Sequence, residues 1–171
     1  RALFDGRIEV VQSEAEAENA LQVLSRASII GIDTETKPVF QPRSKQNKVA
    51  LLQLSTHEVC FLFRLNMIGL TPGLTELLSD ENILKVGLSL HDDFMKLKQL
   101  RRFSPAGYVE LQDYITKFGV QDLSLQKLYA NILGGRISKG QQLTNWEADT
   151  LTDQQKGYAA TDAWACILLY E

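Results

Sequence analysis

The chain contains few of the residues that build disulfide frameworks or zinc cages. It has two cysteines and two histidines among its 171 residues. Cys60 and Cys166 each lie between apolar neighbours in the sequence, so we expect both to be buried, reduced thiols. Sulfur and imidazole ligands this sparse are not typical of a zinc cage, and we expect none.

Long apolar runs are also missing from the sequence. No stretch approaches the roughly 20 residues that a membrane helix needs, and the first residues do not have the order of a signal peptide. We therefore expect an intracellular protein without a membrane partner, cytoplasmic if it is bacterial. The chain begins with Arg1, not Met, which is compatible with a piece of a longer protein. Its length predicts a single domain over residues 1–171.

The overall charge is not that of a typical nucleic-acid binder, since 18 Lys and Arg residues face 21 Asp and Glu residues, for a net charge of −3. The basic residues are unevenly placed, however, because residues 36–48 include four of them and no acid. A local basic patch attracts phosphates even on a mildly acidic protein. The predicted nucleic-acid-binding residues, with the aromatic ring as a base-stacking platform, are Lys37, Phe40, Arg43, Lys45 and Lys48. A solvated surface loop is the alternative.

An apolar run at residues 29–32 leads into two carboxylates, Asp33 and Glu35. Side chains in a strand alternate between faces, so these two point the same way. Like charges side by side oppose each other's ionisation unless a cation lies between them. The pair therefore indicates a site for a hard divalent metal, while an acidic strand end facing water is an equal alternative from these residues alone.

The apolar periodicity predicts alternating helices and strands along the chain. Strands are expected at 8–11, 29–35, 49–55, 59–63, 83–88 and 108–111, and helices at 14–26, 71–79, 90–102, 124–133 and 152–171. Residues 134–150 are rich in Gly, Gln, Thr and Asn, which is typical of a loop. A strand meander followed by alternating helices and strands predicts an α/β fold with a mixed sheet.

Two of the predicted helices carry acids on their inward faces. Asp93 lies three residues after the apolar Leu90 and shares its side of the helix, whereas Asp92 looks outward. In the last helix, Tyr158 and Asp162 are four residues apart and lie on one face among small alanines. The plain alternatives are an aspartate that caps a helix start and a tyrosine–aspartate pair at the rim of the core.

These acids and the tyrosine form an ordered set of motifs. The set is Asp33-x-Glu35, then Lys85-Val86-Gly87 with Asp93, then Tyr158-x-x-x-Asp162. It resembles the three motifs of the DEDD 3′–5′ exonuclease superfamily in its tyrosine-bearing branch. Segments 48–54, 143–147 and 151–163 resemble most the exonuclease domain of the Werner syndrome protein and its bacterial and plant relatives, whereas RNase D and the proofreading domain of bacterial DNA polymerase I are more distant.

The resemblance covers roughly residues 28–170 and implies a fold and a site. The fold would be ribonuclease-H-like, a five-stranded mixed sheet with helices on both sides and the active site at the carboxyl ends of the strands. By the same resemblance, Asp33, Glu35 and Asp162 would hold one divalent ion. Asp33 would bridge to a second ion supported by Asp93, and the hydroxyl of Tyr158 would orient the attacking water.

The activity that this resemblance implies is metal-dependent 3′–5′ exonuclease hydrolysis by a two-metal-ion mechanism with Mg²⁺ or Mn²⁺. The substrate would be nucleic acid with a free 3′ end, DNA favoured over RNA. The alternatives are a non-cutting nucleic-acid-binding or adaptor module on the same fold, and a hydrolase of other phosphate esters. An attached or separate helicase is a further candidate partner, and the oligomeric state stays open.

Overall fold

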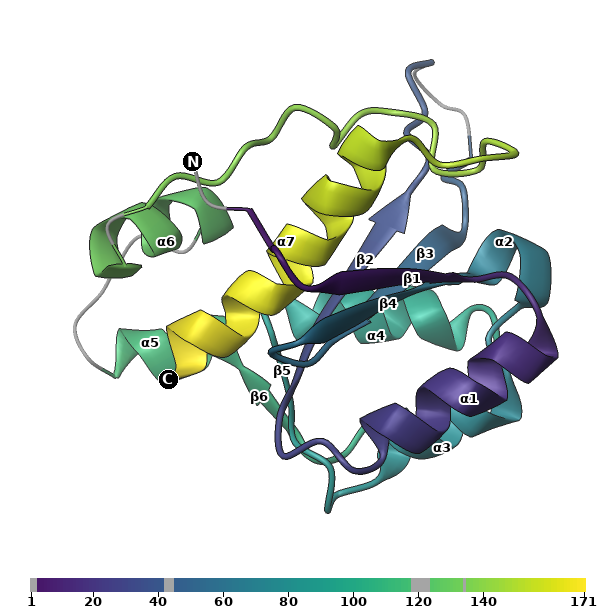
Figure 1. Cartoon of the computed structure of the whole chain (residues 1–171), viewed down its shortest axis with the longest axis horizontal. Helices are drawn as coiled ribbons and strands as arrows, with labels where there is room; N and C mark the ends of the chain where they lie inside the picture. Colours follow the sequence, from purple (N-terminus) through teal and green to yellow (C-terminus); the bar gives the residue numbers. More distant parts are fainter. Residues whose placement is uncertain (1–2, 42–44, 118–123, 134) are drawn as a thin grey trace.

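A computed structural model describes residues 3–41, 45–117, 124–133 and 135–171 (Figure 1). The strands are β1 (Arg7–Val11), β2 (Ile30–Thr36), β3 (Val49–Ser55), β4 (Val59–Arg64), β5 (Lys85–Gly87) and β6 (Tyr108–Glu110). The helices are α1 (Glu14–Leu24), α2 (Leu65–Ile68), α3 (Pro72–Ser79), α4 (Leu90–Lys98), α5 (Leu111–Thr116), α6 (Leu125–Leu133) and α7 (Asp153–Tyr170). Among these residues the strands form one sheet in the order β1-β4-β3-β2-β5-β6.

The sheet is mixed, as the sequence predicts. Strands β2, β3 and β4 pair antiparallel as a meander, β5 and β6 extend it in parallel from β2, and β1 pairs in parallel with β4. The predicted α/β class is therefore confirmed. The sheet has six strands, one more than the five that the resemblance implied, because β1 adds an outer strand with Ile8 opposite Cys60.

Several predicted boundaries were wrong, and local hydrogen bonds explain two of the differences. The helix expected at 90–102 ends at Lys98, because the Leu97 carbonyl accepts from the N–H groups of both Leu100 and Arg101 and tightens the last turn. Residues 111–116 form helix α5 and not the end of a strand. Its N-cap is Glu110, whose carboxylate accepts from the Gln112 N–H at 3.1 Å. Glutamate is not a usual N-cap residue, so the pattern gave no helix start there.

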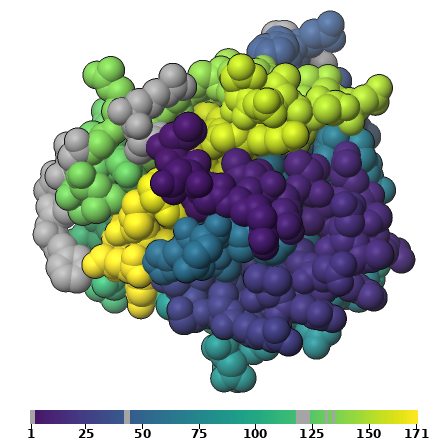
Figure 2. All heavy atoms as spheres, in the orientation of Figure 1, coloured from purple at the N-terminus to yellow at the C-terminus, as the bar shows by residue number. Residues whose placement is uncertain are grey.

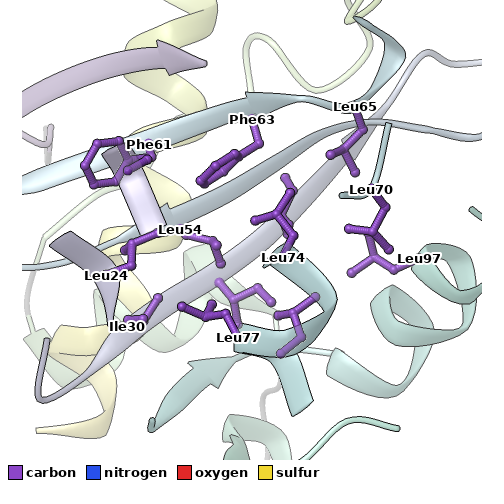
Figure 3. Close-up of a cluster of buried hydrophobic side chains, with 14 of the residues drawn as sticks. Leu24, Ile30, Leu54, Phe61, Phe63, Leu65, Leu70, Leu74, Leu77 and Leu97 are labelled. Atoms are coloured by element: carbon purple, nitrogen blue, oxygen red, sulfur yellow. The ribbon is translucent and has the colours of Figure 1, made fainter. Parts of the chain in front are cut away.

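The period of two in the central strands sends large side chains to both faces of the sheet. In β4, Phe61 and Phe63 join the core beneath α1, α3 and α4, while Cys60 and Leu62 join the core beneath α7. Figure 3 shows the first of these cores, which contains both phenylalanines and Leu74 of α3. Helices therefore cover both faces, which makes the central strands almost entirely apolar.

Helix α7 lies directly on strand β2 with no room for a side chain between them. A Cβ atom added at Gly31 would come within 2.0 Å of the Ala163 carbonyl oxygen. This close approach fixes how near β2 and α7 run to each other. The close approach also brings two acids near each other, because Asp33 lies two residues after Gly31 and Asp162 precedes Ala163.

Replacing Gly31 with Ala is expected to destabilise the fold by roughly 3 kcal/mol, because the added methyl must push α7 off the sheet. For a chain of this length, this corresponds to a Tm lower by about 6–12 °C in a thermal melt. Gly157→Ala is the matched control, since its Cβ would meet only the Leu3 side chain at an ordinary 3.5 Å. In the interior of α7 this second change should be stabilising. A Gly31→Ala protein with an unchanged Tm would contradict the tight contact.

The N-terminal segment is fastened across α7. The Phe4 N–H donates to the Thr161 hydroxyl at 3.0 Å, and the ring centroids of Phe4 and Trp164 lie 5.8 Å apart. Figure 2 shows this segment, in purple, beside the yellow-green stretch of chain that leads into α7. Cys60 and Cys166 are both free and buried, as expected. Within the described residues, no helix has the length and apolar character needed to span a membrane.

Candidate metal centre

Three carboxylates from two distant segments converge where β2 leaves the core. Asp33 and Glu35 come from the end of β2 and Asp162 from the middle of α7, and one oxygen of each lies within 4.8 Å of the others. Glu35 and Asp162 are buried and Asp33 is partly exposed. The strand alternation brings the first two together, and the close packing of α7 on Gly31 brings the third.

Asp93 lies beside this cluster in the first turn of α4. Its Oδ1 accepts a hydrogen bond from the Thr34 hydroxyl at 2.9 Å, and Thr34 stands between the two acids of β2. Asp93 is buried, while the adjacent Asp92 is exposed. The helical periodicity that predicted an inward Asp93 and an outward Asp92 is thus confirmed.

The start of α4 is fixed by an acid that the sequence did not single out. Ser89 has a left-handed conformation, with φ of 59°, and its own side chain does not cap the helix. Instead the carboxylate of Glu110 accepts from the N–H groups of Ser89 at 2.9 Å and Leu90 at 2.6 Å. Strand β6 therefore positions the helix that carries Asp93. A glutamate at the end of a predicted strand gives no sign of this role.

Burial raises the pKa of all four acids, and neighbouring acids raise it further for Asp33, Glu35 and Asp93. Burial, followed by the neighbouring Asp162, raises the pKa of Asp33 to about 8, and burial raises that of Asp162 to about 7. Burial, followed by Asp33, raises the pKa of Asp93 to about 8 and that of Glu35 well above its ordinary value. Without a cation, the cluster therefore holds protons at neutral pH. A bound divalent cation would take their place.

Whether these acids suit a metal ion can be judged from two buried carboxylate oxygens. Asp93 Oδ2 and Asp162 Oδ1 have no hydrogen-bond partner among the described residues. A buried oxygen without a partner is costly, and a cation would satisfy both. Since the donors are all carboxylate oxygens, the set fits Mg²⁺ or Mn²⁺ better than a softer ion.

Tyr158 lies one helical turn before Asp162, and its hydroxyl favours the charged form of that carboxylate, which lowers the pKa of Asp162 against the effect of burial. Burial, followed by the charges of Asp162 and Glu35, raises the pKa of this phenol, so it stays protonated at neutral pH. The fully buried Trp146 packs against its ring, with centroids 6.0 Å apart. The Trp146 indole donates to the Gln142 carbonyl at 3.4 Å, which ties the preceding loop to the tyrosine.

The loop before α7 is held at two further points. The side-chain amide of Gln155 donates to Thr144 Oγ1 at 2.9 Å and to the Asn145 carbonyl at 3.1 Å. The buried Arg64 of β4 donates to the carbonyls of Ala148 and Asp149. These bonds cross from the sheet to the loop, so they orient the first turns of α7, where Tyr158 lies.

A cavity of about 230 Å³, here called the metal cavity, opens beside the cluster. Asp33, Glu35, Tyr158 and Asp162 line it, together with Gln126 from α6 and Lys139 and Gln142 from the following loop. The sequence analysis missed these last three residues. Lys139 and Gln142 lie in a stretch without helical or strand periodicity, and Gln126 is a neutral residue of the predicted helix 124–133 that no motif singled out.

The predicted nucleic-acid-binding residues of segment 36–48 lie elsewhere. Lys37 is half-buried, Lys45 and Lys48 are exposed, and Phe40 is 74% exposed. Arg43 falls outside the described residues. None of the described four lines the metal cavity, so their contact with nucleic acid stays a prediction.

The sequence of residues 8–171 matches the family model described as 3′–5′ exonuclease. The chain belongs to the 3′–5′ exonuclease family. This exonuclease domain is 32% identical over 161 residues to the mouse protein named bifunctional 3′–5′ exonuclease/ATP-dependent helicase WRN. The match covers 91% of this chain and 11% of that protein. The recognition of a DEDD exonuclease from its motifs is therefore confirmed.

Solved structures share the fold of this exonuclease domain. The Nibbler EXO domain of Aedes aegypti has a TM-score of 0.87 at 22% identity, with 99% of this chain and 89% of that chain covered. RNase D of Trypanosoma brucei, in complex with RNA U12, has a TM-score of 0.82 at 23% identity, with 97% and 62% covered. The ribonuclease-H-like fold is thus confirmed, and its acidic cluster is of the kind that binds divalent metal.

Proposed function

We propose that this exonuclease domain removes nucleotides one at a time from the 3′ end of nucleic acid, by hydrolysis that depends on two divalent ions. The observation that carries the proposal is the convergence of Asp33, Glu35 and Asp162 within 4.8 Å, with Asp93 beside them. A purely structural protein gains nothing from four acids drawn together from three separate segments, three of them buried, because a charged group is costly to bury beside others of the same sign.

Each acid has a role in this proposal. Asp33, Glu35 and Asp162 would hold one ion, and Asp33 with Asp93 would hold a second, Mg²⁺ or Mn²⁺ in each case. When bound, such ions help to activate the attacking water and neutralise charge on the phosphate and the departing 3′ oxygen. Thr34 keeps the carboxylate of Asp93 turned toward β2 through its hydroxyl.

In this proposal Tyr158 positions the attacking water and does not remove a proton from it. Its phenol stays protonated at neutral pH, so it cannot act as the base. As a hydrogen-bonding hydroxyl beside Asp162, it orients the attacking water toward the phosphate.

Tyr158→Phe is expected to fold normally and to lower kcat by roughly 10–100-fold, because only the orienting hydroxyl is lost. Single-turnover release of the 3′ nucleotide measures this effect. Tyr170→Phe, at the far end of the same helix, is the control and should retain the wild-type rate. Equal rates for wild type and Tyr158→Phe would remove the tyrosine from the mechanism.

DNA is the favoured substrate in this proposal, because the motifs resemble most those of the Werner syndrome protein. RNA is the second candidate, supported by the likeness to the RNase D structure that holds RNA U12. A helicase, attached or separate, is the proposed partner, since the mouse relative is named for both activities.

The test is a time course on a 5′-labelled DNA oligonucleotide with Mg²⁺, with Mn²⁺ and with chelator, its 3′ hydroxyl free or blocked. The expected result is a ladder that shortens stepwise from the free 3′ end and disappears with chelator. Cleavage of a matched RNA alone would transfer the assignment to RNA. No cleavage of either would favour the non-cutting binding module.

A further inference from the structure

The metal cavity has a second wall that carries no acid. It is formed by α6 and the loop after it, and its side chains are Gln126, Lys139 and Gln142. Two of these are neutral amides and one is an ammonium, so all three can donate hydrogen bonds. Among the described residues that line the cavity, Lys139 is the one Lys or Arg.

Segment 137–142 separates the metal cavity from a larger one. The larger cavity, about 510 Å³, is lined by four residues of this segment, Ile137, Ser138, Gly140 and Gln141. The other two, Lys139 and Gln142, line the metal cavity. The described lining of the larger cavity includes Asp153 and Asp162 and no Lys or Arg. Lys139 therefore gives the metal cavity a cation for an anionic phosphate, which the described lining of its neighbour lacks.

The backbone that carries Lys139 is held in place. The Gln142 N–H donates to the Lys139 carbonyl at 3.2 Å and closes a turn. The Gln142 carbonyl in turn accepts from the indole of Trp146, which packs against Tyr158. Lys139 is thus tied at its backbone to the tyrosine beside the acids, while the residue is exposed and lines the cavity.

We propose that Lys139 is a substrate-binding residue whose ammonium binds a non-bridging oxygen of the phosphate in the 3′-terminal linkage. The inference rests on the proposed function and names one contact of that site. A cavity of about 230 Å³ is smaller than most small-ligand pockets, so it admits one phosphate with its sugar. That phosphate meets carboxylates on one wall, and Lys139 offsets their repulsion from the other.

Lys96 is a second cation near the site but acts from a different direction. From α4 it lowers the pKa of Asp33 and Asp93, partly offsetting the rise that burial causes. It does not line the metal cavity in the described part of the chain. Lys96 therefore acts on the acids, whereas Lys139 faces the space that the substrate enters.

The first test measures binding without cleavage, in an Asp162→Asn background. The probe is a 5′-fluorescein single-stranded DNA with a free 3′ hydroxyl, followed by anisotropy at constant Mg²⁺. Lys139→Gln is expected to raise Kd roughly tenfold and to reduce the slope of log Kd against log salt by about 0.7, the value for one phosphate contact on a single strand. Lys139→Arg should retain most of the affinity. Lys98→Gln, an exposed lysine at the end of α4, is the control and should change neither quantity.

The second test identifies the phosphate. In an oligonucleotide whose last linkage is an uncharged methylphosphonate, Lys139→Gln should no longer weaken binding, whereas the same modification several linkages upstream should leave the effect intact. Wild-type affinity and salt slope in Lys139→Gln would overturn the proposal. So would an effect that survives the neutral last linkage, or an equal loss in Lys98→Gln.

The binding tests of Lys139 and the cleavage test of the proposed function can give opposite results. A Lys139-dependent loss of binding with no cleavage ladder from the unmutated protein would overturn the exonuclease activity and leave the phosphate contact standing. A ladder together with unchanged binding by Lys139→Gln would do the reverse.

Discussion

Replacing Asp162 with Asn is expected to reduce the release of 3′ nucleotides by roughly a thousandfold or more, while the protein stays folded. Asp162 contributes a buried carboxylate to the three-acid cluster, and its Oδ1 has no other partner among the described residues. An amide of the same shape removes the charge that a divalent ion requires but keeps the packing of α7. The measurement is the initial rate on a 5′-labelled oligonucleotide, with folding checked by circular dichroism.

The adjacent aspartates of α4 supply the matched control for this result. Asp93→Asn should lower the rate nearly as much as Asp162→Asn, because Asp93 is buried beside β2. Asp92→Asn should leave the rate unchanged, because its side chain points to solvent one position away. Full activity in Asp93→Asn, or a large loss in Asp92→Asn, would show that the wrong carboxylate is assigned to the site.

Local periodicity predicts which way each candidate acid faces, whereas the resemblance of the motifs assigned these acids to one site. The alternation of β2 places Asp33 and Glu35 on one face, and the helical repeat separates Asp93 from Asp92. The Thr152–Gln155 capping box predicts where α7 begins, and hence that Tyr158 and Asp162 share a face. Each of these inferences needs only neighbours within one turn or two strand residues.

The second wall of the cavity could not be predicted in the same way. Gln126, Lys139 and Gln142 are brought together by contacts between residues distant in the chain or within an irregular loop. Trp146 anchors that loop by packing on Tyr158, twelve positions later, and no periodic pattern encodes such a contact. The basic segment 36–48 is the opposite case. Its charge pattern is visible in the sequence, but its described residues do not line the cavity, so its contact with nucleic acid stays a prediction.

The metal-free protein is expected to lose stability as the pH rises from 5 to 8, with a Tm lower by roughly 5 °C or more. Folding raises the pKa of Asp33 and Asp93 from 3.8 to about 8 and that of Asp162 to about 7. Between pH 4 and 8 the folded state therefore binds more protons than the unfolded state, and its stability falls as the pH increases. The measurement is a series of thermal melts in chelator across this range.

A buried lysine, Lys85, limits the pH range of these thermal melts to pH 8 and below. Burial lowers the pKa of Lys85 from 10.5 to about 8, so between these values the unfolded state holds the extra proton. Stability due to this lysine therefore rises with pH above 8, opposite in sign to the effect of the acids. Melts that stop at pH 8 isolate the acidic cluster.

Asp33→Asn should remove part of this pH dependence. At pH 8 without metal the variant should melt higher than wild type, because the repulsion between Asp33 and Asp162 is gone. At pH 5 the difference should be smaller, since wild-type Asp33 is then protonated in the fold. Asp92→Asn, an exposed neighbour of the cluster, should keep the wild-type slope.

Added Mg²⁺ or Mn²⁺ should reverse the slope in wild type, because metal binds only the deprotonated carboxylates and its affinity increases with pH. A cation that binds the folded state alone stabilises it by RT ln(1 + L/Kd), where L is the free ion concentration, so at a fixed ion concentration the Tm increases as the affinity increases. Asp33→Asn should gain much less from the same ion at pH 8. A metal-free Tm that is constant or rises between pH 5 and 8 would mean that the folded acids do not hold extra protons. The electrostatic argument for a cation at the cluster would then fail.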